Sequence, residues 1–315
     1  MHSPTARKPA SWPAAGGPVR SPRFPASSLV AFFFRSLILG AALAGGLRAQ
    51  SPLATAARLY AAQDFAGARA ALEPLLAREP PSAPACHLFG MCLRQRGDDR
   101  ALDDARPWLE RASQLEPGNP EYLADLAGNC LQLAQLHWSY RLAVRGRALM
   151  ETALRRDPAD VGGREGLMRF YREAPWPLGD RTRAEALAAQ IARLDPRRGA
   201  LAAIYLQRMA RNYPAALALA LAALRSYPDD YRVLFEVGRT AALAGRGAAA
   251  GIAALQQCQR LTPPMDAPTA AEVADQLGIL WAAQGDLGAA RAAYAAALKR
   301  NPADETARRA LEQGP

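Results

Sequence analysis

The feature that most constrains the fold of this 315-residue chain is a short pattern that recurs seven times. Each copy places small or large apolar residues at positions i, i+4 and i+7 and a proline at i+12, as in Ala68, Leu72, Leu75 and Pro80. The first three positions lie on one face of an α-helix, and a proline cannot continue a helix. The pattern therefore predicts seven helices that end before Pro80, Pro117, Pro158, Pro196, Pro228, Pro263 and Pro302.

A second helix is predicted ahead of each of these, and the C-terminal copy shows the pair most clearly. A turn at Gly285-Asp286 separates two apolar faces, which are Ala274, Leu277, Gly278 and Trp281 on the first helix and Ala290, Tyr294 and Ala297 on the second. This spacing resembles the tetratricopeptide repeat, W-x2-L-G-x2-Y followed by A-x3-F and a closing proline. Ala274 stands in place of the leading Trp. Successive prolines are 32 to 41 residues apart, around the family period of 34.

The resemblance covers residues 52 to 303 and implies an all-α fold, a right-handed solenoid of about seven stacked antiparallel helix pairs. Small residues let the helices of a pair approach closely, and each pair buries its apolar face only against its neighbours. We expect residues 50–303 to form the solenoid and residues 304–315 to form a C-terminal capping helix and tail. The first helix around Ala200 to Arg211 matches the repeat least well.

The first 49 residues are predicted to be a leader outside the fold. An uncharged stretch from Ser36 to Leu47 follows a basic segment and precedes Ala49, which is the layout of a secretory signal. Cleavage after Ala49 is the preferred prediction and cleavage after Ala44 the second. The alternative is an uncleaved membrane anchor over Leu29 to Leu47, interrupted by Arg35. The protein is thus expected in the periplasm or secreted, or else anchored in the inner membrane and facing the periplasm.

The net charge of +10 does not indicate nucleic-acid binding once its distribution is considered. The leader carries six basic residues and no acidic one, which leaves 33 basic against 29 acidic residues in the rest of the chain. No nucleic-acid partner is expected, and a membrane is expected as a partner only through the N-terminal segment.

Residues with catalytic or metal-binding patterns are sparse, so we expect no enzyme, no cofactor and no metal site. His87 and His137 stand far apart in sequence without a partnering acid pattern, and no phosphate-binding loop or metal motif occurs. Cys86 and Cys258 occupy signature positions and are expected in the core. A disulfide from Cys86 or Cys92 to Cys130 is the alternative.

Two segments depart from the repeat, Leu133 to Arg145 and Arg172 to Arg183, and both fall between paired helices. Pro175 and Pro177 exclude regular helix in the second segment. We expect Trp176 between them to be packed rather than to serve as a binding anchor. An alternative function follows from this segment, in which it closes a pocket and the chain is a solute- or ligand-binding subunit of an envelope complex.

The leading hypothesis is a scaffold or adaptor of the bacterial cell envelope. In the family, first helices line the concave face and hold peptides or protein segments. Applied to this chain, the resemblance implies a contact set on the first helices in the middle of the array, made of residues that face away from the paired second helix. This set is Asn129, Arg169, Arg172, Tyr205, Arg208, Arg232 and Arg239. This basic set favours an acidic segment or terminal carboxylate. The alternative is that these are ordinary solvated arginines, balanced by Glu165 and Glu173. The Lys and Asn carboxylate clamp of chaperone-binding relatives is not reproduced.

Overall fold

All the regular secondary structure in the described part of the chain is α-helical. The computed structural model describes residues 51–96, 98, 100–264 and 267–314, and these residues form 15 helices and no strand. The leader, with its predicted signal or anchor, lies outside the described residues. None of the described helices has the length and apolar character that a membrane-spanning segment requires.

Fourteen of the helices pair with their sequence neighbours as seven antiparallel hairpins, which confirms the predicted helix pairs. The first helices of the pairs are α1 (Pro52–Ala61), α3 (Ala83–Arg94), α5 (Pro120–Leu136), α7 (Val161–Glu173), α9 (Pro196–Met209), α11 (Tyr231–Ala244) and α13 (Ala270–Ala283). The second helices are α2 (Phe65–Leu76), α4 (Ala101–Leu115), α6 (Tyr140–Arg156), α8 (Arg181–Leu194), α10 (Tyr213–Ser226), α12 (Ala248–Cys258) and α14 (Leu287–Arg300). The last helix, α15 (Glu305–Gln313), packs against α14.

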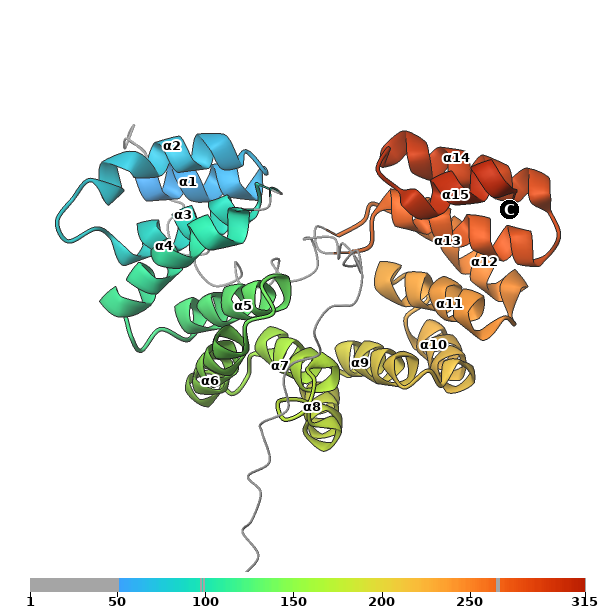
Figure 1. Cartoon of the computed structure of the whole chain (residues 1–315), viewed down its shortest axis with the longest axis horizontal. Helices are drawn as coiled ribbons and strands as arrows, with labels where there is room; N and C mark the ends of the chain where they lie inside the picture. The colour runs from blue at the N-terminus through green and yellow to red at the C-terminus, as the bar shows by residue number, and fades with distance from the viewer. Residues whose placement is uncertain (1–50, 97, 99, 265–266, 315) are drawn as a thin grey trace, which may run out of the picture.

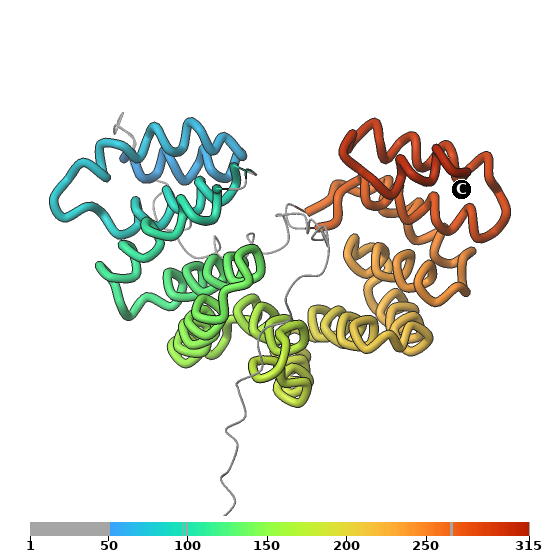
Figure 2. The backbone as a smooth tube through the Cα atoms, viewed as in Figure 1, coloured from blue at the N-terminus to red at the C-terminus, as the bar shows by residue number. Residues whose placement is uncertain are grey.

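The hairpins stack in sequence order into an arc (Figure 1). In the middle of the arc α5, α7, α9 and α11 form an inner layer, and α6, α8 and α10 form an outer layer. The backbone tube follows the same path from the blue to the red end without any segment crossing back (Figure 2). Each second helix also packs against the first helix of the next hairpin, so every inner helix is held between two outer ones.

The helix boundaries follow local chemistry that is readable in the sequence. Each second helix ends two to five residues before its closing proline, as α10 ends at Ser226 before Pro228. Pro196 is the tightest case, because it is also the first residue of α9, and Asp195 alone separates α8 from α9. Asp195 accepts a hydrogen bond from the Arg198 backbone N–H, which satisfies one of the free donors at the start of α9. The helix predicted least clearly is therefore well defined.

Close approach of paired helices requires glycine at two signature positions. A Cβ added to Gly238 in α11 would lie 2.3 Å from the Leu255 side chain of α12, which is fully buried. A Cβ on Gly278 in α13 would lie 2.5 Å from the Tyr294 ring of α14. These contacts confirm that small residues set the spacing within a hairpin.

The two predicted departures from the repeat differ in structure. Around residues 133–145 the extra residues lengthen the helices, because α5 and α6 each have 17 residues and only a short turn separates them. Between α7 and α8 the chain leaves the helix from Ala174 to Asp180, as Pro175 and Pro177 predict. The second departure alone is an inserted loop.

All four cysteines are buried and free. Cys86 and Cys258 lie in the core, as expected from their signature positions. The alternative of a disulfide from Cys86 or Cys92 to Cys130 is wrong for this structure. Small thiols fill tight positions between helices as small apolar residues do.

Candidate functional site

The inner layer brings together most of the residues proposed as a contact set. We define the inner face as the surface of α5, α7, α9 and α11 that looks into the arc (Figure 1). Neighbouring inner helices meet there through polar side chains about one repeat apart in sequence, such as Gln135 and Glu173, whose Nε2 and Oε2 atoms lie 3.5 Å apart. Polar contacts of this kind join neighbouring inner helices, whereas apolar residues fill the space between the layers.

Tyr205 on α9 contacts three of the charged side chains of α7 and α9. The guanidinium groups of Arg169 and Arg208 lie 5.2 and 5.5 Å from its ring centroid, within cation–π distance. Its hydroxyl donates a hydrogen bond to the Glu173 carboxylate on α7. Burial, and then the Glu173 charge, raise the pKa of Tyr205, so the hydroxyl stays protonated and donating.

Arg208 and Arg239 share one acidic partner, Glu236 on α11. Arg239 Nη2 lies 3.1 Å from Glu236 Oε1, and Arg208 Nε lies 3.6 Å from Glu236 Oε2. The second separation is an ion pair but is too long for a hydrogen bond. The Nε atoms of both arginines are buried without a hydrogen-bond partner among the described residues. Burial lowers the pKa of Arg208 and Glu236 opposes that effect, although a guanidinium keeps its charge in either case.

The inner arginine cluster, as we name it, consists of Arg169, Arg172, Tyr205, Arg208 and Arg239 with Glu173 and Glu236. Arg172 belongs to it through a hydrogen bond from its guanidinium to the Met209 carbonyl at the end of α9. Arg232, the remaining arginine of the predicted set, is half-buried in the first turn of α11.

Asn129 was wrongly placed in the contact set. Its side chain is fully buried, and its amide donates a hydrogen bond to the Leu102 carbonyl on α4. The prediction considered only the face turned away from α6, the second helix of the same hairpin. Because α5 is also covered by α4 of the preceding hairpin, a residue that points away from α6 can still be buried.

The acidic residues that pair with the inner arginine cluster differ partly from those expected. Glu173 accepts the Tyr205 hydrogen bond, whereas Glu165 pairs with Arg198, which lies outside the predicted set. Glu236 was missed. The signal that could have found these pairs is the repeat itself, because residues on first helices about one period apart become neighbours, as do Glu173 and Tyr205 at a separation of 32 residues.

Both described histidines have acidic partners that sequence reasoning missed. His87 Nε2 lies 2.7 Å from Asp125 Oδ2, and His137 Nε2 lies 2.9 Å from Asp103 Oδ2. The separations of 38 and 34 residues are again about one repeat. His87 is buried in α3, whereas His137 is exposed at the end of α5.

Trp176 is not packed as expected. It is 85% exposed in the loop between α7 and α8, so it neither plugs the structure nor covers a pocket. A surface cavity is present elsewhere, lined by Ala253, Gln256, Gln257, Arg260 and Leu261 on and just after α12. Neither observation places a solute pocket at the Pro175–Pro177 segment.

Comparisons with known proteins identify the fold. No protein-family model matches the sequence, and no curated protein matches it. A solved tetratricopeptide repeat protein from Parabacteroides merdae superposes with a TM-score of 0.61 at 16% identity, over 83% of this chain and 96% of that one. Yeast Tom70 superposes with a TM-score of 0.60 at 13% identity, over 89% of this chain and 59% of Tom70. A chain of the Cut9–Hcn1 hetero-tetramer of APC/C gives a TM-score of 0.57 at 15% identity, over 84% and 48%.

Proposed function

We propose that this chain, whose fold is that of the tetratricopeptide-repeat proteins, is a scaffold that binds an acidic protein or peptide segment on its inner face. The fold supplies an extended inner surface without forming a closed site, which suits a partner held along several repeats. The inner arginine cluster supplies the chemistry.

The observation that carries this proposal is an incomplete set of pairings in the cluster. Arg169 makes a cation–π contact with Tyr205 and has no ion pair among the described residues. Arg208 and Arg239 share Glu236 and leave their buried Nε donors without hydrogen bonds. Four arginines therefore face two glutamates, one of which is engaged by the Tyr205 hydroxyl.

A carboxylate from a partner would complete these pairings. The Arg208 and Arg239 side chains are 19% and 27% exposed, so a partner's carboxylate can reach their guanidinium groups. Guanidinium groups bind carboxylates through two parallel hydrogen bonds, and their fixed planar geometry favours carboxylates over neutral acceptors. Acidic peptides should therefore bind more tightly than basic peptides of equal length.

We further propose that the scaffold works in the bacterial cell envelope, on the basis of the secretory layout of residues 36–49. Intact mass measurement of the protein recovered from its native host tests this part separately. A mature chain that begins at Gln50 supports cleavage after Ala49, and an intact leader in the membrane fraction supports the anchor.

Binding on the inner face is tested with fluorescent peptides of matched length that are rich in Asp and Glu, or in Lys. Anisotropy titrations at low and high salt should show binding of the acidic peptide only, weakened by salt because exposed charges are screened. Arg169→Glu should weaken this binding at least tenfold, because it replaces a positive charge of the cluster with a negative one. Arg169 has no ion pair among the described residues, so its replacement should not disturb the fold.

The matched control is Arg193→Glu, an exposed arginine on α8 in the same hairpin but in the outer layer. It changes the net charge equally and should leave acidic-peptide binding unchanged. An equal loss of affinity in both variants would mean that overall charge alone drives binding. No loss of affinity in either variant would mean that the peptide binds elsewhere on the surface.

A further inference from the structure

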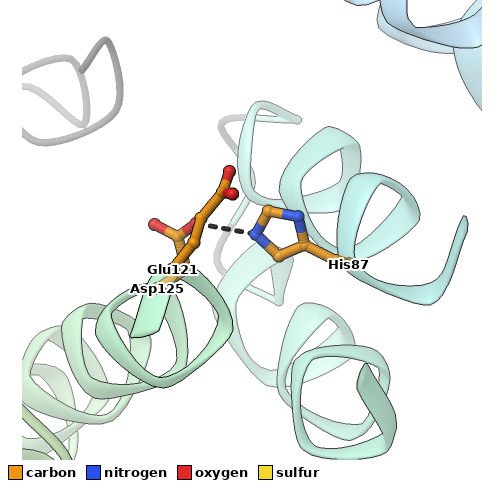
Figure 3. Close-up of side chains that lie close together, drawn as sticks. All are labelled: His87, Glu121 and Asp125. Atoms are coloured by element: carbon orange, nitrogen blue, oxygen red, sulfur yellow. Dashed lines mark hydrogen bonds and ion pairs between the residues drawn. The ribbon is translucent and has the colours of Figure 1, made fainter. Parts of the chain in front are cut away.

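A second polar cluster lies on the first helices near the N-terminal end of the arc, apart from the inner arginine cluster. His87 projects from α3 toward Glu121 and Asp125 on α5 (Figure 3). One nitrogen of His87 and one carboxylate oxygen from each acid all lie within 4.8 Å of one another. The three side chains are buried or half-buried.

Helix geometry places these groups together. Glu121 and Asp125 are four residues apart on α5, so their side chains project from the same face of the helix. His87 lies 38 residues before Asp125 and reaches it from the neighbouring hairpin. The cluster therefore spans two hairpins, and stacking alone brings its members into register.

The cluster holds two carboxylates beside one imidazole and one guanidinium. Asp125 uses Oδ2 toward His87 Nε2 at 2.7 Å, and its Oδ1 lies 3.9 Å from Arg94 Nη1. The half-buried Glu121 carboxylate has no hydrogen bond or ion pair among the described residues. With a neutral imidazole, two carboxylates face one guanidinium, which leaves an excess negative charge that a cation would balance.

We propose that His87, Glu121 and Asp125 bind a divalent transition-metal ion of the zinc type. An imidazole nitrogen with two carboxylate oxygens is a donor set that Zn²⁺ accepts, with ligand distances of about 2.0–2.2 Å. Two ligand atoms on one tetrahedral ion with such bonds lie about 3.4 Å apart, so the widest separation within the 4.8 Å limit must shorten by up to about 1.4 Å. Three protein ligands leave the fourth tetrahedral position to water.

The neighbouring groups suit this assignment. Coordination through His87 Nε2 requires the imidazole proton to be on Nδ1, and the ion then takes the place of the hydrogen bond to Asp125. Arg94 is buried, and its Nη1 lies 3.9 Å from Oδ1, so its charge faces that oxygen while Oδ2 faces His87. Mg²⁺ fits less well, because it prefers an octahedral shell of oxygen atoms.

A bound ion would join α3 to α5 and so fix the angle between the second and third hairpins. The full chain, without any affinity tag and treated with a chelator, is titrated with ZnCl₂ in a calorimeter and, in parallel, with Co²⁺ monitored by its visible absorption. The expected result is one ion per chain and a raised thermal midpoint, since a ligand that binds only the folded state stabilises it.

Glu121→Gln is the decisive variant, because it removes a ligand charge at a half-buried position with no partner to lose. It should weaken Zn²⁺ binding at least tenfold while leaving the circular dichroism spectrum unchanged. Asp125→Asn should weaken binding similarly and provides a second, independent variant.

His137→Gln is the control, because the His137–Asp103 pair has the same chemistry but no third ligand beside it in the described structure. Binding should be unchanged in this variant. Zn²⁺ affinity equal to wild type in Glu121→Gln, or no binding by wild type, would overturn the proposal. Equal affinity for Mg²⁺ and Zn²⁺ would overturn the choice of metal.

Discussion

Arg198 on α9 and Glu165 on α7 form a two-pronged ion pair, in which Nε lies 2.7 Å from Oε1 and Nη2 lies 2.6 Å from Oε2. The pair joins the fourth and fifth hairpins. Arg198 is 4% exposed, whereas water reaches the Glu165 side chain, which is 23% exposed. Removing Glu165 should therefore cost more stability than removing Arg198.

Glu165→Leu should destabilise the fold by about 3 kcal/mol, because it removes the two-pronged carboxylate that pairs with a buried guanidinium. Arg198→Met should cost less, since the remaining carboxylate can be hydrated. The double variant should be more stable than Glu165→Leu alone. Urea unfolding midpoints measure all three, and a double variant whose loss equals the sum of the single losses would contradict the coupling.

Alanine at two helical glycines should change stability in opposite directions. At Gly238 three atoms of the buried Leu255 side chain lie within 2.6 Å of the new Cβ, so overpacking should cost about 1–3 kcal/mol. At Gly128 in α5 the nearest atom is Arg94 Nη2 at 3.9 Å, so the better helix propensity of alanine should add about 0.5–1 kcal/mol. Thermal midpoints that shift in the same direction would show that helix spacing is not the deciding factor.

Asp275 on α13 should make the fold less stable as the pH rises. Burial, with a contribution from Asp304, raises the pKa of Asp275 from its ordinary value of 3.8 to about 6. The folded state then binds more protons than the unfolded state between about pH 4 and 6, so stability falls through this window and levels off above it.

Asp275→Asn should remove this slope and raise stability at pH 7 by about 1 kcal/mol, a value reduced for the partial exposure of the group. The measurement is the urea midpoint of both proteins at pH 4.5 and pH 7. An unchanged difference between the two proteins across that range would mean that Asp275 is charged throughout.

The cysteines should be unreactive in the native protein. Burial raises the pKa of Cys92 and of Cys258 to about 12, and it also raises the pKa of Cys86 and of Cys130. Since the thiolate is the reactive form, a thiol reagent at pH 8 should label none of them in the folded state and all four after unfolding in urea. Labelling of only two after unfolding without reductant would reveal a disulfide.

The helices and their pairing were predictable because their signals are local. A proline that ends a helix, an aspartate that caps one and apolar residues at helical spacing act within about ten residues, so Pro228 or Asp195 can be interpreted without knowing the fold. Seven repetitions in register also predicted the stacking, since no hairpin buries its apolar face alone.

The candidate sites were predicted only in part. Arg169, Tyr205 and Arg208 do meet on the inner face, because they lie on faces of α7 and α9 that point away from their own second helices. The prediction for Asn129 was wrong and Glu236 was missed, since the surroundings of both residues depend on the adjacent hairpin. The prediction that Trp176 is packed was wrong, because nothing in the local sequence distinguishes a packed aromatic residue in a loop from an exposed one.

The sequence by itself determined that the chain forms helical hairpins that stack in order, because helix signals and the repeat period are properties of short segments. Tertiary structure decided which side chains meet across hairpins, such as His87 with Asp125 and Arg208 with Glu236. Those meetings depend on the angle and offset between neighbouring hairpins, which are set by the packing of whole helix faces such as Gly238 against Leu255.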